Sequence, residues 1–218
     1  MVTNLNMDFK KAVVIEQKDR DWIPTRMQGV DRQMLEREDA ESGRATTIVR
    51  YATKSRFSEH VHSGGEEFFV LEGVFSDETG DFGPGMYVRN PVGSRHSPHS
   101  NAGTVIFVKL DQMAPDDQDY VRVDTTKEAW QPGLVEGLSV MLLHQYGTEN
   151  VALEKWQPGT VFNRHAQPGG EEFLVIEGVF EDEHGRYPKG TWLRYPPASV
   201  HTPFSTEGCT ILVKTGHL

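Results

Sequence analysis

Three histidines and one glutamate in the first half of the chain have the types and spacing of a metal site. His60 and His62 lie two residues apart, so in a β-strand both imidazoles project into the same space. Ser63-Gly64-Gly65 can turn the chain tightly and place Glu66 beside them, while His96 follows a later turn. Three imidazoles and one carboxylate suit a divalent metal such as Zn, Fe, Mn, Ni or Cu, and the residue types do not select among these ions. The alternative is that these histidines only form ordinary hydrogen bonds. That interpretation would be favoured for any single histidine, but not for the full set.

A second copy of this pattern occurs in the other half of the chain. Residues 60–98 align without a gap to residues 165–203, and both segments contain Gly-Gly-Glu-Glu-Phe followed by Glu-Gly-Val-Phe. The second set is His165, Gln167, Glu171 and His201. An amide oxygen is a weaker ligand than imidazole for zinc or copper. Two alternatives therefore stay open for the second half: a weaker metal site or a purely structural unit.

The repeat extends over nearly the whole sequence and indicates a duplicated domain. Trp22 has a counterpart in Trp130, and the apolar run at 103–109 has one at 208–214. The acidic stretch Asp111–Asp119 is the expected linker. We therefore expect two domains, residues 1–115 with an intact metal motif and residues 116–218 with an altered one, each of an ordinary single-core size.

The segments that must position these residues are predicted to be β-strands. Short runs rich in Val, Ile, Phe, Tyr or Thr are bounded by turn-forming residues, which is the signature of strands. The expected strands are Ala45–Ala52, Glu66–Glu72, Met86–Arg89 and Thr104–Leu110, and the best helix candidate is Asp31–Glu38. Many short strands in about 100 residues favour an all-β fold, a sandwich or a small barrel built from two Greek keys.

Composition limits the classes of partner. The 218 residues carry a formal net charge of -10 without a Lys/Arg-rich run, so binding to nucleic acid through a basic patch is not expected. No long apolar run predicts a membrane span, and no N-terminal pattern predicts a signal peptide. Cys209 is the one cysteine, is expected to be buried, and fits a reducing, cytoplasmic setting.

Together these residues resemble the cupin family. The string His60-x-His62-x3-Glu66-x6-Gly73 is similar to the first cupin motif, with Lys54 in place of its leading glycine, and Gly85-x5-Pro91-x-Gly93-x2-His96 is similar to the second. The second half departs at Gln167 and at Ala198, which replaces a motif glycine. More narrowly, the chain resembles the ChrR-like cupins, which include the C-terminal domain of the zinc-binding anti-sigma factor ChrR. The resemblance implies two tandem jelly-roll barrels, with a metal held in the first by His60, His62, Glu66 and His96.

Three functional classes follow from the resemblance. The first is a metal-sensing or regulatory protein, although nothing here resembles the His/Cys zinc domain with which ChrR binds its sigma factor, so binding to a sigma factor is doubtful. The second is a metal-dependent dioxygenase, since similar cupins cleave acetylacetone or dihydroxyacetophenone. The third is a structural two-barrel protein that binds a ligand without turnover. A small-molecule ligand is the expected partner in each case, and a homodimer is possible.

Two pairs of charged residues recur outside the metal motifs. Arg89 and Arg194 match across the repeats, and an ion pair with a carboxylate is the favoured interpretation over a site for an anionic ligand. Glu67 and Glu172 have the opposite strand parity to the expected ligands, so they are expected to face outward.

Overall fold

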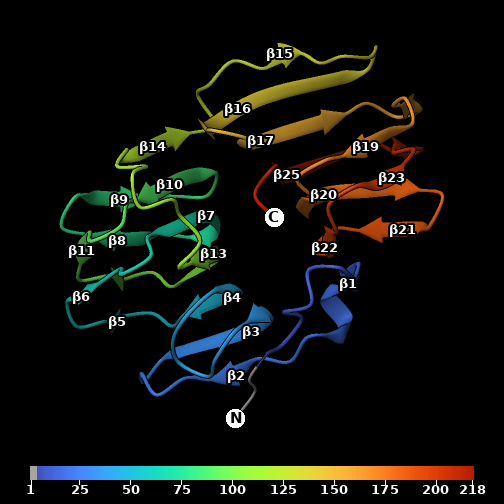
Figure 1. Cartoon of the computed structure of the whole chain (residues 1–218). Coiled ribbons are helices and arrows are strands. Elements are labelled where there is room, and N and C mark those ends of the chain that lie inside the picture. The colour runs from blue at the N-terminus through green and yellow to red at the C-terminus, as the bar shows by residue number, and fades with distance from the viewer. Residues whose placement is uncertain (1–3) are drawn as a thin grey trace. The chain divides into compact units, whose positions relative to one another are not determined.

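The computed structural model describes residues 4–218, and residues 1–3 of the first expected domain lie outside this range. Strands make up both halves of the described chain (Figure 1). The one helical element among the described residues is the short 3₁₀ turn η1 (Gln17–Asp19). No described helix has the length and apolar character needed to cross a membrane. The chain divides into two compact units, and the first comprises residues 4–7 and Asp21–Lys127.

The first unit is built on a seven-stranded antiparallel sheet with the order β14-β10-β7-β13-β4-β3-β2. A four-stranded sheet, β5-β12-β8-β9, and the ribbon β11-β6 complete it. Its strands are β2 (Ile23–Pro24), β3 (Val30–Arg37), β4 (Ala45–Tyr51), β5 (Ser55–Arg56), β6 (His60–Val61), β7 (Glu66–Gly73), β8 (Phe75–Asp77), β9 (Gly80–Phe82), β10 (Met86–Asn90), β11 (Arg95–His96), β12 (His99–Ser100), β13 (Thr104–Leu110) and β14 (Val121–Asp124).

The second unit, Asp8–Arg20 with Glu128–Leu218, repeats this plan. Its main sheet has the order β1-β22-β20-β25-β17-β16-β15, with β18, β21 and β24 attached, and β19 pairs with β23. Its strands are β1 (Val13–Ile15), β15 (Gln131–Pro132), β16 (Leu138–Tyr146), β17 (Glu149–Trp156), β18 (Thr160–Val161), β19 (His165–Gln167), β20 (Glu171–Asp182), β21 (Gly185–Pro188), β22 (Trp192–Tyr195), β23 (Ser199–His201), β24 (Phe204–Ser205) and β25 (Cys209–Thr215).

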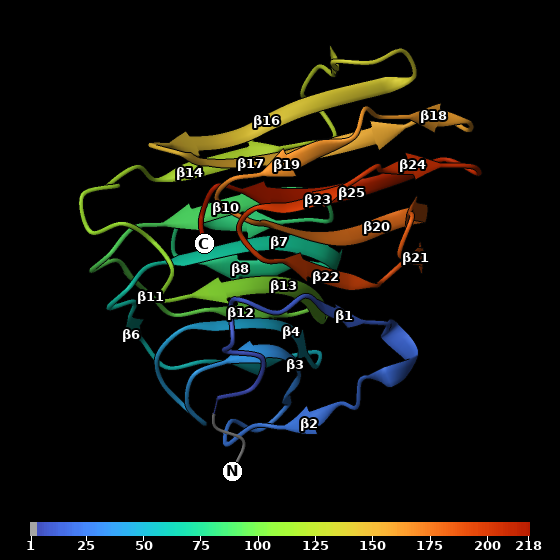
Figure 2. The same cartoon turned by 45° about the vertical axis from the view of Figure 1, so that its right-hand side comes forward.

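The edge strand of each main sheet comes from a segment that lies next to the other unit in the sequence. Strand β1 precedes most of the first unit but belongs to the sheet of the second, and β14 follows the first metal motif and belongs to the sheet of the first. Strand β1 pairs with β22, and β14 pairs with β10, as Figures 1 and 2 both show. This differs from the two continuous segments expected from the repeat, 1–115 and 116–218. The physical reason is that β10 and β22 would otherwise present unpaired backbone groups at a sheet edge.

The expected strands are present, and the expected helix is not. The four strands predicted in the first half correspond to β4, β7, β10 and β13. The helix prediction for Asp31–Glu38 was wrong, since all of these residues except Glu38 lie in β3, which pairs with β4. The polar sequence favours a helix weakly, but pairing satisfies the backbone and buries Leu35 completely. Tertiary packing therefore overrides local propensity.

The face of β7 opposite the metal motif is also buried. Glu67, expected to face outward, is only 5% exposed, and Glu172 is likewise buried. The guanidinium of Arg89 binds Glu67 and also lies 2.6 Å from the Asp117 carboxylate. The outward-facing prediction was therefore wrong for both glutamates, because Arg89 covers Glu67 and the indole NH of Trp192 donates to Glu172 at 2.8 Å. The ion pair predicted for Arg89 is confirmed.

Two substitutions in the cupin motifs keep the backbone conformation that glycine normally adopts there. Lys54 has φ 60° and Ala198 has φ 64°, while their counterparts Gly159 and Gly93 have φ 82° and 84°. A non-glycine residue in this left-handed region costs about 1 kcal/mol or more. The motif geometry is therefore preserved at both positions in spite of the altered residue.

The strain at Ala198 gives a direct test by substitution. Ala198→Gly is expected to raise the free energy of unfolding by about 1 kcal/mol, because it relieves the left-handed strain. The matched change Gly93→Ala should lower it by a similar amount, since an added Cβ there has no atom within 4 Å. Chemical denaturation of both variants measures the difference. A loss of stability in Ala198→Gly would contradict the interpretation.

Candidate metal centre

A two-stranded ribbon and the start of a sheet strand position the site in the first unit. Strands β6 and β11 pair so that His60 lies opposite His96. His62 follows β6 directly, and its backbone NH donates to the carbonyl of Ser94 at 2.9 Å. Glu66 is the first residue of β7, immediately after the turn at Ser63-Gly64-Gly65. Three separate segments therefore bring the four predicted residues into one region.

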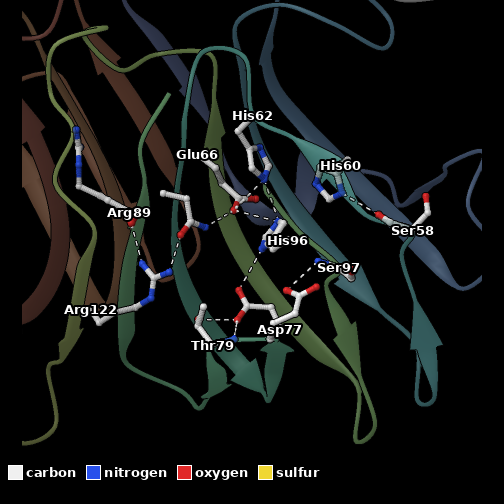
Figure 3. A network of polar contacts seen from close by, with 12 residues as sticks. Ser58, His60, His62, Glu66, Asp77, Thr79, Arg89, His96, Ser97 and Arg122 are labelled. Atoms are coloured by element: carbon white, nitrogen blue, oxygen red, sulfur yellow. Dashed lines mark hydrogen bonds and ion pairs between the residues drawn. The ribbon is translucent and has the colours of Figure 1, made fainter. Parts of the chain in front are cut away.

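The three imidazoles form a compact triangle. Their ring centroids are 4.8–4.9 Å apart, and one ligand atom from each histidine lies within 4.8 Å of the others. The Nε2 atoms of His62 and His96 are 2.9 Å apart. The Glu66 carboxylate lies 3.5 Å from the first of these and 3.6 Å from the second. Figure 3 shows His62, Glu66 and His96 turned toward one another.

The imidazoles of His60 and His96 form hydrogen bonds through Nδ1, which leaves their Nε2 atoms free to face the centre of the histidine triangle. Nδ1 of His60 lies 3.1 Å from the Ser58 carbonyl, and Nδ1 of His96 lies 3.1 Å from the Asp77 carboxylate. Both partners accept, so each Nδ1 donates its hydrogen and each Nε2 carries the lone pair that a metal needs. The donor set therefore fits a divalent first-row ion held by the three imidazoles and the carboxylate of Glu66.

A chain of two hydrogen bonds positions the carboxylate of Glu66. The side-chain amide of Asn90 donates to Glu66 at 2.8 Å, and Arg122 donates to the Asn90 oxygen at 2.6 Å. Sequence reasoning missed Asn90, Arg122 and Asp77. Only Asp77 has a signal that could have found it, because it recurs as Asp182 in the second copy. Arg122 lies on the edge strand β14, far from the motifs in the sequence.

Burial and hydrogen bonding move the two buried histidines in opposite directions. Burial lowers the pKa of His62, an effect that the charge of Glu66 only partly offsets. Burial also disfavours protonated His96, but the hydrogen bond to Asp77 and the charge of Glu66 outweigh it and raise the pKa of His96. For Asp77 itself, hydrogen bonds from His96 and Thr79 outweigh burial and bring the pKa to about 2. Asp77 is thus ionised at any ordinary pH.

These shifts set a pH range for metal retention. A metal needs the unprotonated imidazole. Because the pKa of His96 is raised, protons begin to compete with the metal at a pH above the usual histidine pKa of about 6.5. We expect affinity for Zn²⁺ to fall as the pH drops from about 8 to about 5, with the loss beginning near neutrality. A metal-indicator titration at several pH values measures this. Constant affinity across that range would contradict histidine ligation.

The Asp77 contact gives a prediction for a residue outside the ligand set. Asp77→Asn should lower the pKa of His96 and weaken metal binding about 10- to 100-fold, the usual cost of losing a ligand's hydrogen-bond partner. The matched control is Glu78→Gln, which changes an exposed neighbour that accepts from the backbone of Ser97. An NMR titration of His96 and a metal titration give the two readouts. Equal affinities in the two variants would exclude the positioning role.

The second unit arranges its counterparts differently. The amide nitrogen of Gln167 lies 2.7 Å from Nε2 of His165 and 3.1 Å from the carboxylate of Glu171. A carboxylate only accepts, so the amide must donate to Glu171, and its other hydrogen is directed at His165. Two of the atoms that would bind a metal are thus engaged by one amide. Among the described residues, the three-histidine group of the first unit has no equivalent here.

A buried aspartate adds to this closed arrangement. Burial disfavours protonated His201, but hydrogen bonds to Asp182 and Glu171 outweigh it and raise the pKa of His201 to about 9. Asp182 also accepts from the hydroxyls of Tyr187 and Tyr195, at 3.0 and 2.7 Å. A proton bound by His201 competes with a metal ion for the lone pair of the imidazole. Proton competition at His201 therefore favours weak metal binding at the second site.

The first site opens onto a cavity. Its volume is about 520 Å³, and its lining includes His60, His62, Glu66 and the aromatic rings of Tyr51 and Phe57. His62 and His96 are buried, whereas His60 is half-buried at the edge of the cavity. A cavity of this size can hold a small organic molecule.

Comparisons with known proteins agree with this architecture. The family model of the ChrR cupin-like domain matches residues 10–114 and again residues 118–218. A candidate dioxygenase from Nostoc punctiforme has a TM-score of 0.80 at 16% identity, covering 96% of this chain and 84% of that chain. A variant of oxalate decarboxylase from Bacillus subtilis has a TM-score of 0.66 at 14% identity, covering 99% and 78%. A variant of salicylate 1,2-dioxygenase from Pseudoaminobacter salicylatoxidans has a TM-score of 0.62 at 12% identity, covering 79% and 70%.

No match is found among curated proteins. The structural likenesses, all at low identity, establish the fold, which is two tandem cupin jelly-roll barrels as predicted. The two units of the structure are these barrels.

Proposed function

Because the chain belongs to the ChrR cupin-like family, we propose that its first barrel is a metal-dependent enzyme of the dioxygenase class that acts on a small organic molecule. The observation that carries the proposal is a three-histidine cluster at the wall of a cavity of about 520 Å³. A purely structural site would be closed on all sides, whereas a catalytic metal keeps open positions. Structural neighbours that are named as dioxygenases support the same class.

The residues of the first barrel have distinct roles in this proposal. His60, His62, Glu66 and His96 would hold the ion, which would supply Lewis-acid and, if redox-active, electron-transfer chemistry. Asp77 fixes the ring of His96 through its 3.1 Å contact. The apolar part of the cavity wall, which includes Met27, Tyr51 and Phe57, would exclude water from a bound substrate and so strengthen its polar interactions.

A metal-sensing or regulatory role is the second candidate, favoured by the family match to the cupin domain of ChrR. The two candidates differ in the metal they need. Iron, manganese or nickel supports an oxygenase, whereas tightly held zinc supports sensing, because zinc has no redox chemistry. Elemental analysis of protein purified without added metal separates them.

Oxygen uptake tests the enzymatic proposal directly. Protein loaded with Fe²⁺ is assayed in an oxygen electrode against a panel of small diketones, aromatic ketones and carboxylates. We expect uptake with at least one compound, and its loss in His62→Ala but not in the matched second-barrel variant Gln167→Ala. Iron that binds at the first site without uptake on any compound of the panel would argue against the dioxygenase class.

A further inference from the structure

Three arginines, Arg26, Arg32 and Arg37, line the same cavity as the histidine cluster, and the last two lie on one strand. Arg32 and Arg37 both lie on β3, five residues apart, and would face opposite sides of a regular strand. A β-bulge between Met34 and Glu36 shifts the register, so that Arg32 pairs with Val49 and Arg37 with Ala45. Those partners have the same parity on β4. The bulge therefore turns both guanidinium groups to the inner face.

The positive charge of this pair is only partly compensated. Arg32 donates to the carbonyl of Ala40 at 3.2 Å and to the carboxylate of Glu41 at 3.3 Å, and its Nε is buried without a hydrogen-bond partner. Arg37, 5% exposed, donates from Nε to the Ala40 carbonyl at 2.9 Å. Burial, followed by the charge of Arg32, lowers the pKa of Arg37, and the charges of Glu41 and Asp39 offset this only in part. The carboxylate that pairs with Arg32 belongs to Glu41, whose side chain is 43% exposed, and the carboxylates of Glu66 and Asp111 also line the cavity.

The second barrel lacks both arginines. Its strand β16 has the same bulge, and the register places Val140 opposite Glu154 and Gln145 opposite Asn150. These positions are equivalent to those of Arg32 and Arg37. The two cations thus occur only in the barrel that also has the three-histidine cluster. A structural need of the fold would require them in both barrels, so their distribution points to the ligand.

We propose that Arg32 and Arg37 bind the carboxylate of the substrate, whose apolar body lies against the cavity wall toward the metal ligands. This inference rests on the proposed function, because it assigns a substrate class to that same site. Guanidinium groups match carboxylates in geometry and charge, and such bonds are strongest when buried. The wall of the cavity includes Met27, Tyr51 and Phe57, which suit an apolar or aromatic body. The substrate class is therefore small organic acids with an apolar body.

Binding of benzoate and benzamide tests the proposal, because the two compounds share a ring and differ in charge. We expect wild-type protein to bind benzoate about tenfold or more tightly than benzamide by calorimetry. The double variant Arg32→Val/Arg37→Gln, which installs the residues of the second barrel, should lose this preference. The control Arg50→Gln removes an arginine from the outer face of β4, paired there with Asp31, and should keep it. Equal binding of the two compounds by wild-type protein would overturn the proposal.

A second variant keeps the test valid if the double variant does not fold. Glu41→Gln removes the partly exposed carboxylate that competes for Arg32, so it should tighten benzoate binding several-fold and leave benzamide unchanged. Unchanged or weaker benzoate binding in Glu41→Gln would count against the arginine site. His62→Ala separates this inference from the proposed function. It should retain some preference for benzoate without bound metal, and loss of the whole preference would place the carboxylate on the metal instead.

Discussion

Replacing His62 by alanine is expected to reduce the metal affinity of the first barrel by about 100-fold or more. His62 is one of four ligands proposed for the site, and its Nε2 lies 2.9 Å from that of His96. Losing even a ligand's hydrogen-bond partner costs about 10- to 100-fold, so losing a ligand should cost at least as much. Metal content after dialysis against a weak chelator measures the effect.

The control for this variant comes from the repeat itself. Gln167→Ala changes the equivalent position in the second barrel and should leave the metal content of the protein unchanged. Thermal unfolding of the metal-free forms checks that both variants remain folded. Retention of wild-type stoichiometry in His62→Ala would show that the metal binds elsewhere in the chain.

Gln167→His is expected to raise the binding stoichiometry from about one metal ion per chain to about two. The imidazole supplies a lone pair where the amide of Gln167 now donates to Glu171 and is directed at His165. The change therefore adds a strong nitrogen ligand and frees two others in one step. Titration of Zn²⁺ into stripped protein, followed by calorimetry, gives the number of sites and their affinities.

The order of filling in the wild-type protein belongs to the same prediction. The site with His60, His62, Glu66 and His96 should fill before any binding at His165, Gln167, Glu171 and His201, because only the first has three imidazoles. The pKa of about 9 at His201 adds proton competition at the second site. Filling of the second site first, or no gain from Gln167→His, would mean that Gln167 is not a defect.

The fold and the histidine cluster could be predicted because they depend on local sequence patterns, most of which recur in the second half of the chain. Spacing of two places His60 and His62 on one face of any strand, and the aligned repeat identifies the segments that must be equivalent. The glycine-rich turn before Glu66 fixes the return of the chain. Each of these features acts over a few residues, so no knowledge of distant contacts is needed.

The features that were missed depend on distant contacts. Arg122 reaches Asn90 only because β14 pairs with β10, and the helix expected at Asp31–Glu38 is overridden by pairing with β4. The side chain of Arg37 faces the cavity only because of a β-bulge in β3, and no local sequence pattern predicts that bulge. Burial of Glu67 needs a cation from a neighbouring strand, which strand parity alone does not reveal.

X-ray absorption spectroscopy of protein loaded with one equivalent of Zn²⁺ is the most direct test of the metal site in the first barrel. Three imidazole nitrogens and one carboxylate oxygen at about 2.0–2.2 Å are expected around the ion. In His62→Ala loaded in the same way, the imidazole contribution should fall to about two or the ion should fail to bind. A wild-type spectrum without imidazole scattering, or one unchanged in His62→Ala, would contradict the assignment of the first barrel as the metal centre.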